Sequence, residues 1–102
     1  MDKAQLAFMY IVPDGDPAKH RATITNSAFF DLTVVGVKDY AQATEVAQKL
    51  VAQGVSAIEL CGGFGHGGVA KVAQAVGEKA SVGAVRFDCH PVLGFKSGDT
   101  IG

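Results

Sequence analysis

The residues with the clearest chemical potential form a glycine-rich run from Cys61 to Gly68. The run reads CGGFGHGG and lies between an apolar stretch that ends at Leu60 and an amphipathic stretch that begins at Val69. Its five glycines leave backbone N–H groups uncovered at the start of a predicted helix. The first N–H groups of a helix have no partner inside it, and the helix dipole attracts negative charge. The run therefore predicts a binding site for a phosphate or carboxylate group.

A second group of polar residues follows the last predicted strand. Asp88, Cys89 and His90 come directly after an apolar stretch that ends at Phe87. Ligands of open α/β sheets bind beyond the carboxyl ends of the strands, so the two groups should face each other if their strands are neighbours. The residues expected to contact an anionic ligand at this edge are Gly62, Gly63, Phe64, Gly65, His66, Gly67, Gly68, Arg86 and Asp88.

The glycine run also matches a dinucleotide-binding pattern. G-x-G-x-x-G fits from Gly63 to Gly68, and Asp88 follows twenty residues further on. The chain ends fourteen residues after Asp88, which leaves no second half to hold a nicotinamide. The sequence therefore favours a simple anion over a dinucleotide, and it identifies no cofactor. A tight strand-to-helix turn with close helix packing explains the glycines equally well without any ligand.

Thiol chemistry is an alternative at the same edge. Cys61 stands close to a helix N-terminus, which favours the thiolate, and His90 or His66 has the chemistry of its base. Glu59 is suited to act as an acid or base beside Arg86, or simply to pair with it across neighbouring strands. The candidate catalytic residues are Cys61, His90 and Glu59. Both cysteines of the chain fit equally well as small apolar side chains.

The edge also holds side chains that zinc accepts as ligands. They are Cys61, His66, Asp88, Cys89 and His90. Their spacing matches none of the paired metal-binding motifs, and three consecutive residues do not all reach one ion. We therefore predict no metal site.

The elements that position these residues follow from hydrophobic periodicity. Apolar stretches predict strands at 6–12, 29–37, 57–61 and 82–87, and amphipathic stretches predict helices at 40–53 and 69–76. The order β-β-α-β-α-β predicts an α/β fold, a two-layer sandwich with a four-stranded, mainly parallel sheet and two helices. The place of the first strand in the sheet is left open. Residues 88–102 are expected to form an irregular C-terminal tail.

Alternation along the strands predicts what each sheet face carries. If Leu32 and Val34 share a face with Ile58 and Leu60, both helices cover that one side. A parallel sheet with a polar second face is open to solvent there, or is covered by a partner subunit or by the tail. We expect a homodimer through this polar face. Its side chains would be Asp31, Thr33, Glu59 and Arg86.

Size and composition bound the class of protein. The 102 residues suit one domain with its own core, and a net charge of −1 with scattered basic residues argues against nucleic-acid binding. No apolar stretch approaches the ~20 residues of a membrane-spanning helix. The N-terminus lacks the features of a signal peptide. Two cysteines without an export signal predict a reduced, cytoplasmic protein.

Several motifs together resemble a family of small bacterial proteins of about this length. That family carries an I-E-L-C-G-G-F-G loop, an R-F-D strand end and an S-G-D tail, which appear here at 58–65, 86–88 and 97–99. The resemblance covers nearly the whole chain. It implies an α/β fold, and because the family's function is unknown it implies no reaction.

The function favoured by these observations is a small-molecule binding protein or sensor, with an anionic ligand on the glycine run. The alternative is a small enzyme that uses a Cys61–histidine thiol site or a bound metal. A structural or interaction module without a ligand is a further alternative.

Overall fold

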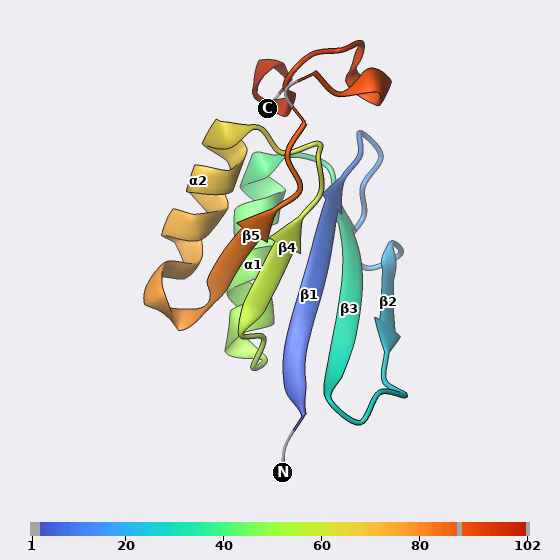
Figure 1. Cartoon of the computed structure of the whole chain (residues 1–102), viewed down its shortest axis with the longest axis vertical. Helices are drawn as coiled ribbons and strands as arrows, with labels where there is room; N and C mark the ends of the chain where they lie inside the picture. Colours follow the sequence, from blue (N-terminus) through green and yellow to red (C-terminus); the bar gives the residue numbers. More distant parts are fainter. Residues whose placement is uncertain (1–2, 88, 102) are drawn as a thin grey trace.

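A computed structural model describes residues 3–87 and 89–101, so the predictions about Asp88 lie outside the described residues. Five strands form one sheet in the order β2-β3-β1-β4-β5 (Figure 1). β1, β3, β4 and β5 are parallel, and β2 pairs with β3 in the antiparallel direction. The strands span Ala4–Ile11 (β1), Arg21–Ile24 (β2), Phe30–Val37 (β3), Ala57–Leu60 (β4) and Ser81–Ala84 (β5).

Two helices, α1 (Tyr40–Ala52) and α2 (His66–Val76), cover the same face of the sheet (Figure 1). Asp39 is the N-cap of α1, since its side chain accepts a 2.8 Å hydrogen bond from the Gln42 N–H. Gly54, with a φ of 102°, turns the chain back after α1. Three short 3-10 turns follow, η1 (Gly77–Lys79), η2 (Pro91–Leu93) and η3 (Gly98–Thr100).

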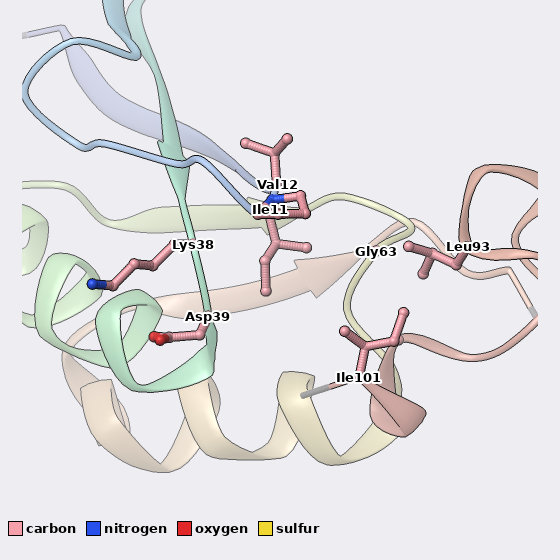
Figure 2. A pocket seen from close by; sticks show the side chains of 9 residues that line it. Ile11, Val12, Lys38, Asp39, Gly63, Leu93 and Ile101 are labelled. Atoms are coloured by element: carbon pink, nitrogen blue, oxygen red, sulfur yellow. The ribbon is translucent and has the colours of Figure 1, made fainter.

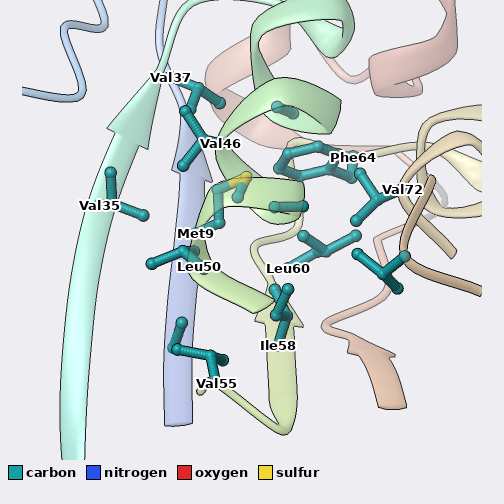
Figure 3. Packing of buried hydrophobic residues seen from close by; sticks show 14 of the residues in the cluster. Met9, Val35, Val37, Val46, Leu50, Val55, Ile58, Leu60, Phe64 and Val72 are labelled. Carbon is teal, nitrogen blue, oxygen red and sulfur yellow. The ribbon is translucent and has the colours of Figure 1, made fainter. Parts of the chain in front are cut away.

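The hydrophobic core lies between the sheet and the two helices (Figure 3). Met9 of β1, Val35 of β3 and Ile58 of β4 are fully buried there. Phe64 belongs to the glycine run and is only 1% exposed. The run is therefore anchored in the core by its own aromatic side chain.

The predicted fold class is confirmed: an α/β sandwich with a mainly parallel sheet and two helices on one side. The sheet has five strands and not four, because β2 adds an antiparallel edge. All four residues of β2 are exposed, and no apolar stretch marks them in the sequence. The last strand, β5, ends at Ala84, three residues before the predicted end.

β1 is the central strand of the sheet, the position that the sequence left open. It pairs with β3 over eight residues and with β4 over four. Ala7 and Met9 of β1 enter the core, and Leu6 and Phe8 lie on the other face of the sheet. Since both sets are apolar, β1 shows no polar alternation.

α2 begins at His66, three residues before the predicted start at Val69. Gly65 is its N-cap, so the N–H groups of Gly67 and Gly68 belong to its first turn. Glycine is a poor helix former, and the periodic pattern therefore placed the start too late. Within the described residues, neither helix is long and apolar enough to cross a membrane.

The sheet face away from the helices is apolar, which corrects the predicted polar face. Val35 points into the core, and since side chains alternate along a strand, Asp31 and Thr33 share its side of the sheet. Leu32 and Val34 therefore lie on the open face. The prediction was wrong because it aligned β3 directly with β4, although β1 lies between them.

Of the four side chains expected on that face, Glu59 lies there within a strand, next to Phe8 of β1. Arg86 follows the end of β5 and is exposed. An interaction between Glu59 and Arg86 stays a prediction. Asp31 instead pairs with Lys3 at 3.1 Å.

Candidate functional site

The C-terminal segment places a carboxylate on the glycine run. Asp99 of η3 accepts hydrogen bonds of 2.9 Å from the Gly67 N–H and 3.2 Å from the Gly68 N–H. Both donors belong to the first turn of α2, where N–H groups have no partner inside the helix. The charge also lies at the positive end of the helix dipole. These two N–H groups thus hold an anion that belongs to the chain itself.

Tyr40, the first residue of α1, connects this carboxylate to the glycine run. Its hydroxyl donates to Asp99 Oδ1 at 2.9 Å and accepts from the Gly65 N–H at 3.0 Å. The buried ring stacks on Phe64, with centroids 5.6 Å apart and planes inclined by 14°. Lys71 Nζ lies 6.0 Å from the ring centroid. Tyr40 therefore holds Asp99 in place from the side of the core.

Hydrogen bonds lower the pKa of Asp99, and burial raises the pKa of Tyr40. The Gly67 N–H lowers the pKa of Asp99 below its ordinary value of 3.8, and the Tyr40 hydroxyl, the Gly68 N–H and the charge of His66 act in the same direction. Burial raises the pKa of Tyr40 above 10.0, and the Asp99 carboxylate adds to this effect. At neutral pH Asp99 is therefore ionised and Tyr40 is neutral, the states in which their hydrogen bonds form.

Two glycines of the run allow these groups to come so close. A methyl group on Gly65 would overlap the Asp99 carboxylate, and one on Gly68 would overlap the Tyr40 ring. Neither glycine has a positive φ. Glycine is thus required at these two positions because a side chain would not fit, and not because the backbone conformation is unusual.

Two residues after β5, Phe87 and Gly98, also pack closely against the glycine run. The Phe87 ring covers Gly62, where a methyl group would overlap it, and lies against His90 with centroids 4.6 Å apart. Gly98 of η3 lies against the carbonyl oxygen of Gly63 and leaves no room for a side chain. Since β4 and β5 are neighbours, the glycine run and the segment that follows β5 lie at the same edge of the sheet. Contact of the run with residues 88–90 stays a prediction.

A cavity of about 150 Å³ lies beside the contact between η3 and the glycine run (Figure 2). The charged ends of Lys38 and Asp39 point away from Leu93 and Ile101 in Figure 2, so the interior is mainly apolar. The cavity extends to Gly98, the residue before Asp99. Its lining residues are Ile11, Val12, Pro13, Lys38, Asp39, Gly63, Leu93, Gly98 and Ile101.

The predicted catalytic residues Cys61 and His90 make separate hydrogen bonds, each with a backbone N–H group. Cys61 is half-buried after β4, and its Sγ accepts a 3.3 Å hydrogen bond from the Gly63 N–H. His90 accepts a 3.1 Å bond on Nδ1 from the Val92 N–H, which caps η2. His66 is exposed at the start of α2. No hydrogen bond among the described residues joins Cys61 to a histidine, and thiol catalysis stays a prediction.

The other predicted residues lie around this edge without converging on it. Arg86 is exposed and donates a 3.5 Å hydrogen bond to the Phe87 carbonyl oxygen. Glu59 is exposed on the open sheet face. Within residues 3–87 and 89–101, no group of three His, Cys, Asp or Glu side chains lies close enough together to hold a metal ion.

Tyr40 and Asp99 were missed by the sequence reasoning. The S-G-D motif at 97–99 contains Asp99, and this motif was the one signal that pointed to it. Tyr40 carried no signal, because an aromatic residue in the first turn of an amphipathic helix is an ordinary core position. Their hydrogen bond joins residues 59 positions apart, which no local pattern predicts.

Comparison with known proteins supports the expected family membership. A search of curated proteins and a search of solved structures each found no significant match. A family model described as a family of unknown function, DUF6506, matches residues 4–100. The match runs from the first residue of β1 to the last residue of η3, so it includes both the glycine run and Asp99. The chain therefore belongs to the DUF6506 family, a family of unknown function.

Proposed function

We propose that the protein binds and senses a small anionic molecule at the start of α2. The anionic group would accept hydrogen bonds from the Gly67 and Gly68 N–H groups, and the apolar part would enter the neighbouring cavity. The observation that supports this most strongly is the Asp99 carboxylate on those same N–H groups. Donors that hold an internal carboxylate have the chemistry to hold the carboxylate or phosphate of a ligand.

Asp99 then acts as an internal competitor of the ligand. Its carboxylate lies on the short turn η3 near the end of the chain, and the residue is exposed. A ligand anion that replaces it takes over its hydrogen bonds and displaces the Asp99 side chain from the glycine run. Because both anions need the same donors, ligand binding and the Asp99 contact exclude each other. This exchange would be the signal of the sensor.

The cavity favours a ligand with a compact apolar body. Its volume of about 150 Å³ is similar to that of an apolar protein cavity known to accept benzene. One wall consists of Ile11, the last residue of β1, and Val12 after it, while Leu93 and Ile101 come from the C-terminal segment. An aromatic or branched aliphatic carboxylate, or the matching phosphate ester, combines the two required features.

Benzoate is a suitable probe because it joins one carboxylate to one ring. We expect a titration of the full chain, followed by amide NMR, to give saturable shifts at Gly67 and Gly68 together with Ile11 and Val12. Acetate, which lacks the ring, and benzyl alcohol, which lacks the charge, should bind more weakly. Phenyl phosphate distinguishes a phosphate from a carboxylate preference. The absence of saturable shifts with both benzoate and phenyl phosphate would refute the proposal.

A further inference from the structure

The sheet face opposite the helices presents a continuous apolar surface. Register places side chains of β1, β3 and β2 side by side on it, and Ile24 and Phe30 are 54% and 39% exposed. Within the five strands, Glu59 is the only charged residue on this face. The strand residues of the open sheet face are Ala4, Leu6, Phe8, Tyr10, Ala22, Ile24, Phe30, Leu32, Val34, Gly36, Ala57, Glu59, Ser81 and Gly83.

Nothing in the described part of the chain covers this surface. Both helices pack on the opposite side, and the C-terminal segment lies beyond the carboxyl ends of the strands (Figure 1). The Tyr10 ring lies over Gly36 and fills the space that its missing side chain would leave in this surface. On β1 and β3 the face is therefore apolar along its whole length.

The size of the face suits a small, reversible dimer interface. Five strands spaced about 4.8 Å apart span about 24 Å, and the eight-residue strands β1 and β3 run about 26 Å. Since β2, β4 and β5 have four residues each, the footprint is about 440 Å² per chain. Two such faces together bury about 900 Å², the size of a weak interface that forms at high protein concentration.

The apolar character of the face favours a second copy of the same chain as its binding partner. A partner with a charged surface would lose hydration against this face and gain almost no ion pairs in return. A second open sheet face has the same apolar character and twist, and two such faces pack at about 30° to each other. A two-fold axis near Phe8, in the middle of the central strand, brings the apolar centres together.

We infer that the protein forms a two-fold symmetric dimer through the open sheet face. Phe8 and Val34 lie at the centre of the interface, where truncation has the greatest effect on affinity. Glu59 belongs to β4 and lies beside Phe8, on the side away from Val34. The candidate ligand site is at the carboxyl ends of the strands, so the dimer leaves it accessible. This inference is independent of the proposed function.

A matched pair of substitutions tests the dimer by sedimentation at high micromolar concentration. Val34→Lys places a charge at the centre of the face, and Val92→Lys makes the same change at an 84% exposed position outside it. We expect wild type and Val92→Lys to sediment as dimers, and Val34→Lys to weaken dimerisation by at least about tenfold.

Ile24→Lys serves as a second variant on the same face, at the more exposed edge strand β2. Circular dichroism checks that each variant is folded, and if Val34→Lys does not fold, Ile24→Lys decides the test. A wild-type monomer at every concentration would overturn the inference. So would a folded face variant that dimerises as tightly as Val92→Lys.

Discussion

The Asp99 carboxylate joins three parts of the chain that are distant in sequence. It accepts hydrogen bonds from Tyr40 at the start of α1 and from Gly67 and Gly68 at the start of α2, and it belongs to η3. Two N-terminal helix turns and the C-terminal segment thus meet at one ionised side chain. This is an N-cap supplied by a residue far along the chain, and it combines with a buried tyrosine.

Replacing Asp99 by alanine should cost about 1 kcal/mol of unfolding free energy, the ordinary cost of losing a helix cap. The released C-terminal segment should also be cut faster by trypsin at Lys96. Urea unfolding and limited digestion measure the two effects. Glu45→Ala is the matched control, because it removes the same charge from an exposed position inside α1. Equal stability and digestion of the two variants would contradict the role of Asp99.

The contact should also depend on pH in a defined direction. The pKa of Asp99 is lowered in the folded protein, so its contribution to stability is complete above 3.8 and is lost as the pH falls through the lower, folded pKa. The raised pKa of Tyr40 keeps its hydroxyl protonated up to about pH 10. Amide NMR of Gly67 and Gly68 in acid should give a midpoint below 3.8 that disappears in Asp99→Asn. A midpoint above 3.8 would contradict this.

The glycine run works as a junction between elements. Phe64 anchors it in the core, and its small residues lie under Tyr40, Phe87 and η3. Gly98 contacts the backbone of Gly63, and a backbone group cannot rotate away as a side chain can. The contact therefore has no room for a larger residue at position 98. The glycines of the run are therefore needed for close packing as well as for access to the N–H groups.

Gly98→Ala should detach η3 from the run. The added methyl group would overlap the Gly63 carbonyl oxygen, so we expect a loss of about 1–3 kcal/mol and faster cleavage at Lys96. Gly83→Ala is the matched control, because no atom lies within 4 Å of a methyl group at that position in β5. Urea unfolding compares the two. Equal unfolding free energies of Gly98→Ala and Gly83→Ala would show that the close packing of η3 does not stabilise the fold.

The elements that were predictable from the sequence are those with a strong local pattern. Val46, Ala47 and Leu50 mark α1 through their helical spacing, and continuous apolar residues mark β1. β2 was missed because all four of its residues are exposed and its pairing depends on β3. The faces of β3 were assigned wrongly because strand order, which decides the alignment, arises from contacts distant in sequence.

The candidate site was predictable only as a location. Parallel neighbouring strands bring the glycine run and the segment after β5 to one edge, as the order of elements implied. The partner of the Gly67 and Gly68 N–H groups could not be predicted, because Asp99 lies about thirty residues away in an irregular segment. Such a segment has no hydrophobic periodicity, so the sequence does not predict which part of the fold it contacts.

The whole molecule presents two separate surfaces on one sheet. The strand ends carry the cavity and the Asp99 contact, and the flat face carries the apolar residues of the proposed dimer. Helices on one side only leave the second face for a partner. Ligand binding and dimerisation are therefore expected to occur independently of each other.

The melting temperature should rise with protein concentration, because dimerisation binds only folded chains. Calorimetry of the wild type over a hundredfold range of concentration measures this. Val34→Lys should melt at a temperature that does not change with concentration. A wild-type melting temperature that is equally constant would contradict the dimer, while leaving the ligand site untouched.

The central claim is that Asp99 occupies the place of a ligand anion, and one comparison of affinities tests it most directly. Asp99→Asn keeps the size of the side chain and removes the competing charge. The account predicts that this variant binds benzoate about tenfold more tightly than wild type, as expected if the lost competition is worth about 1.4 kcal/mol. Glu45→Gln, which removes a distant charge, should bind as wild type does. Equal or weaker binding of benzoate by Asp99→Asn would contradict the account.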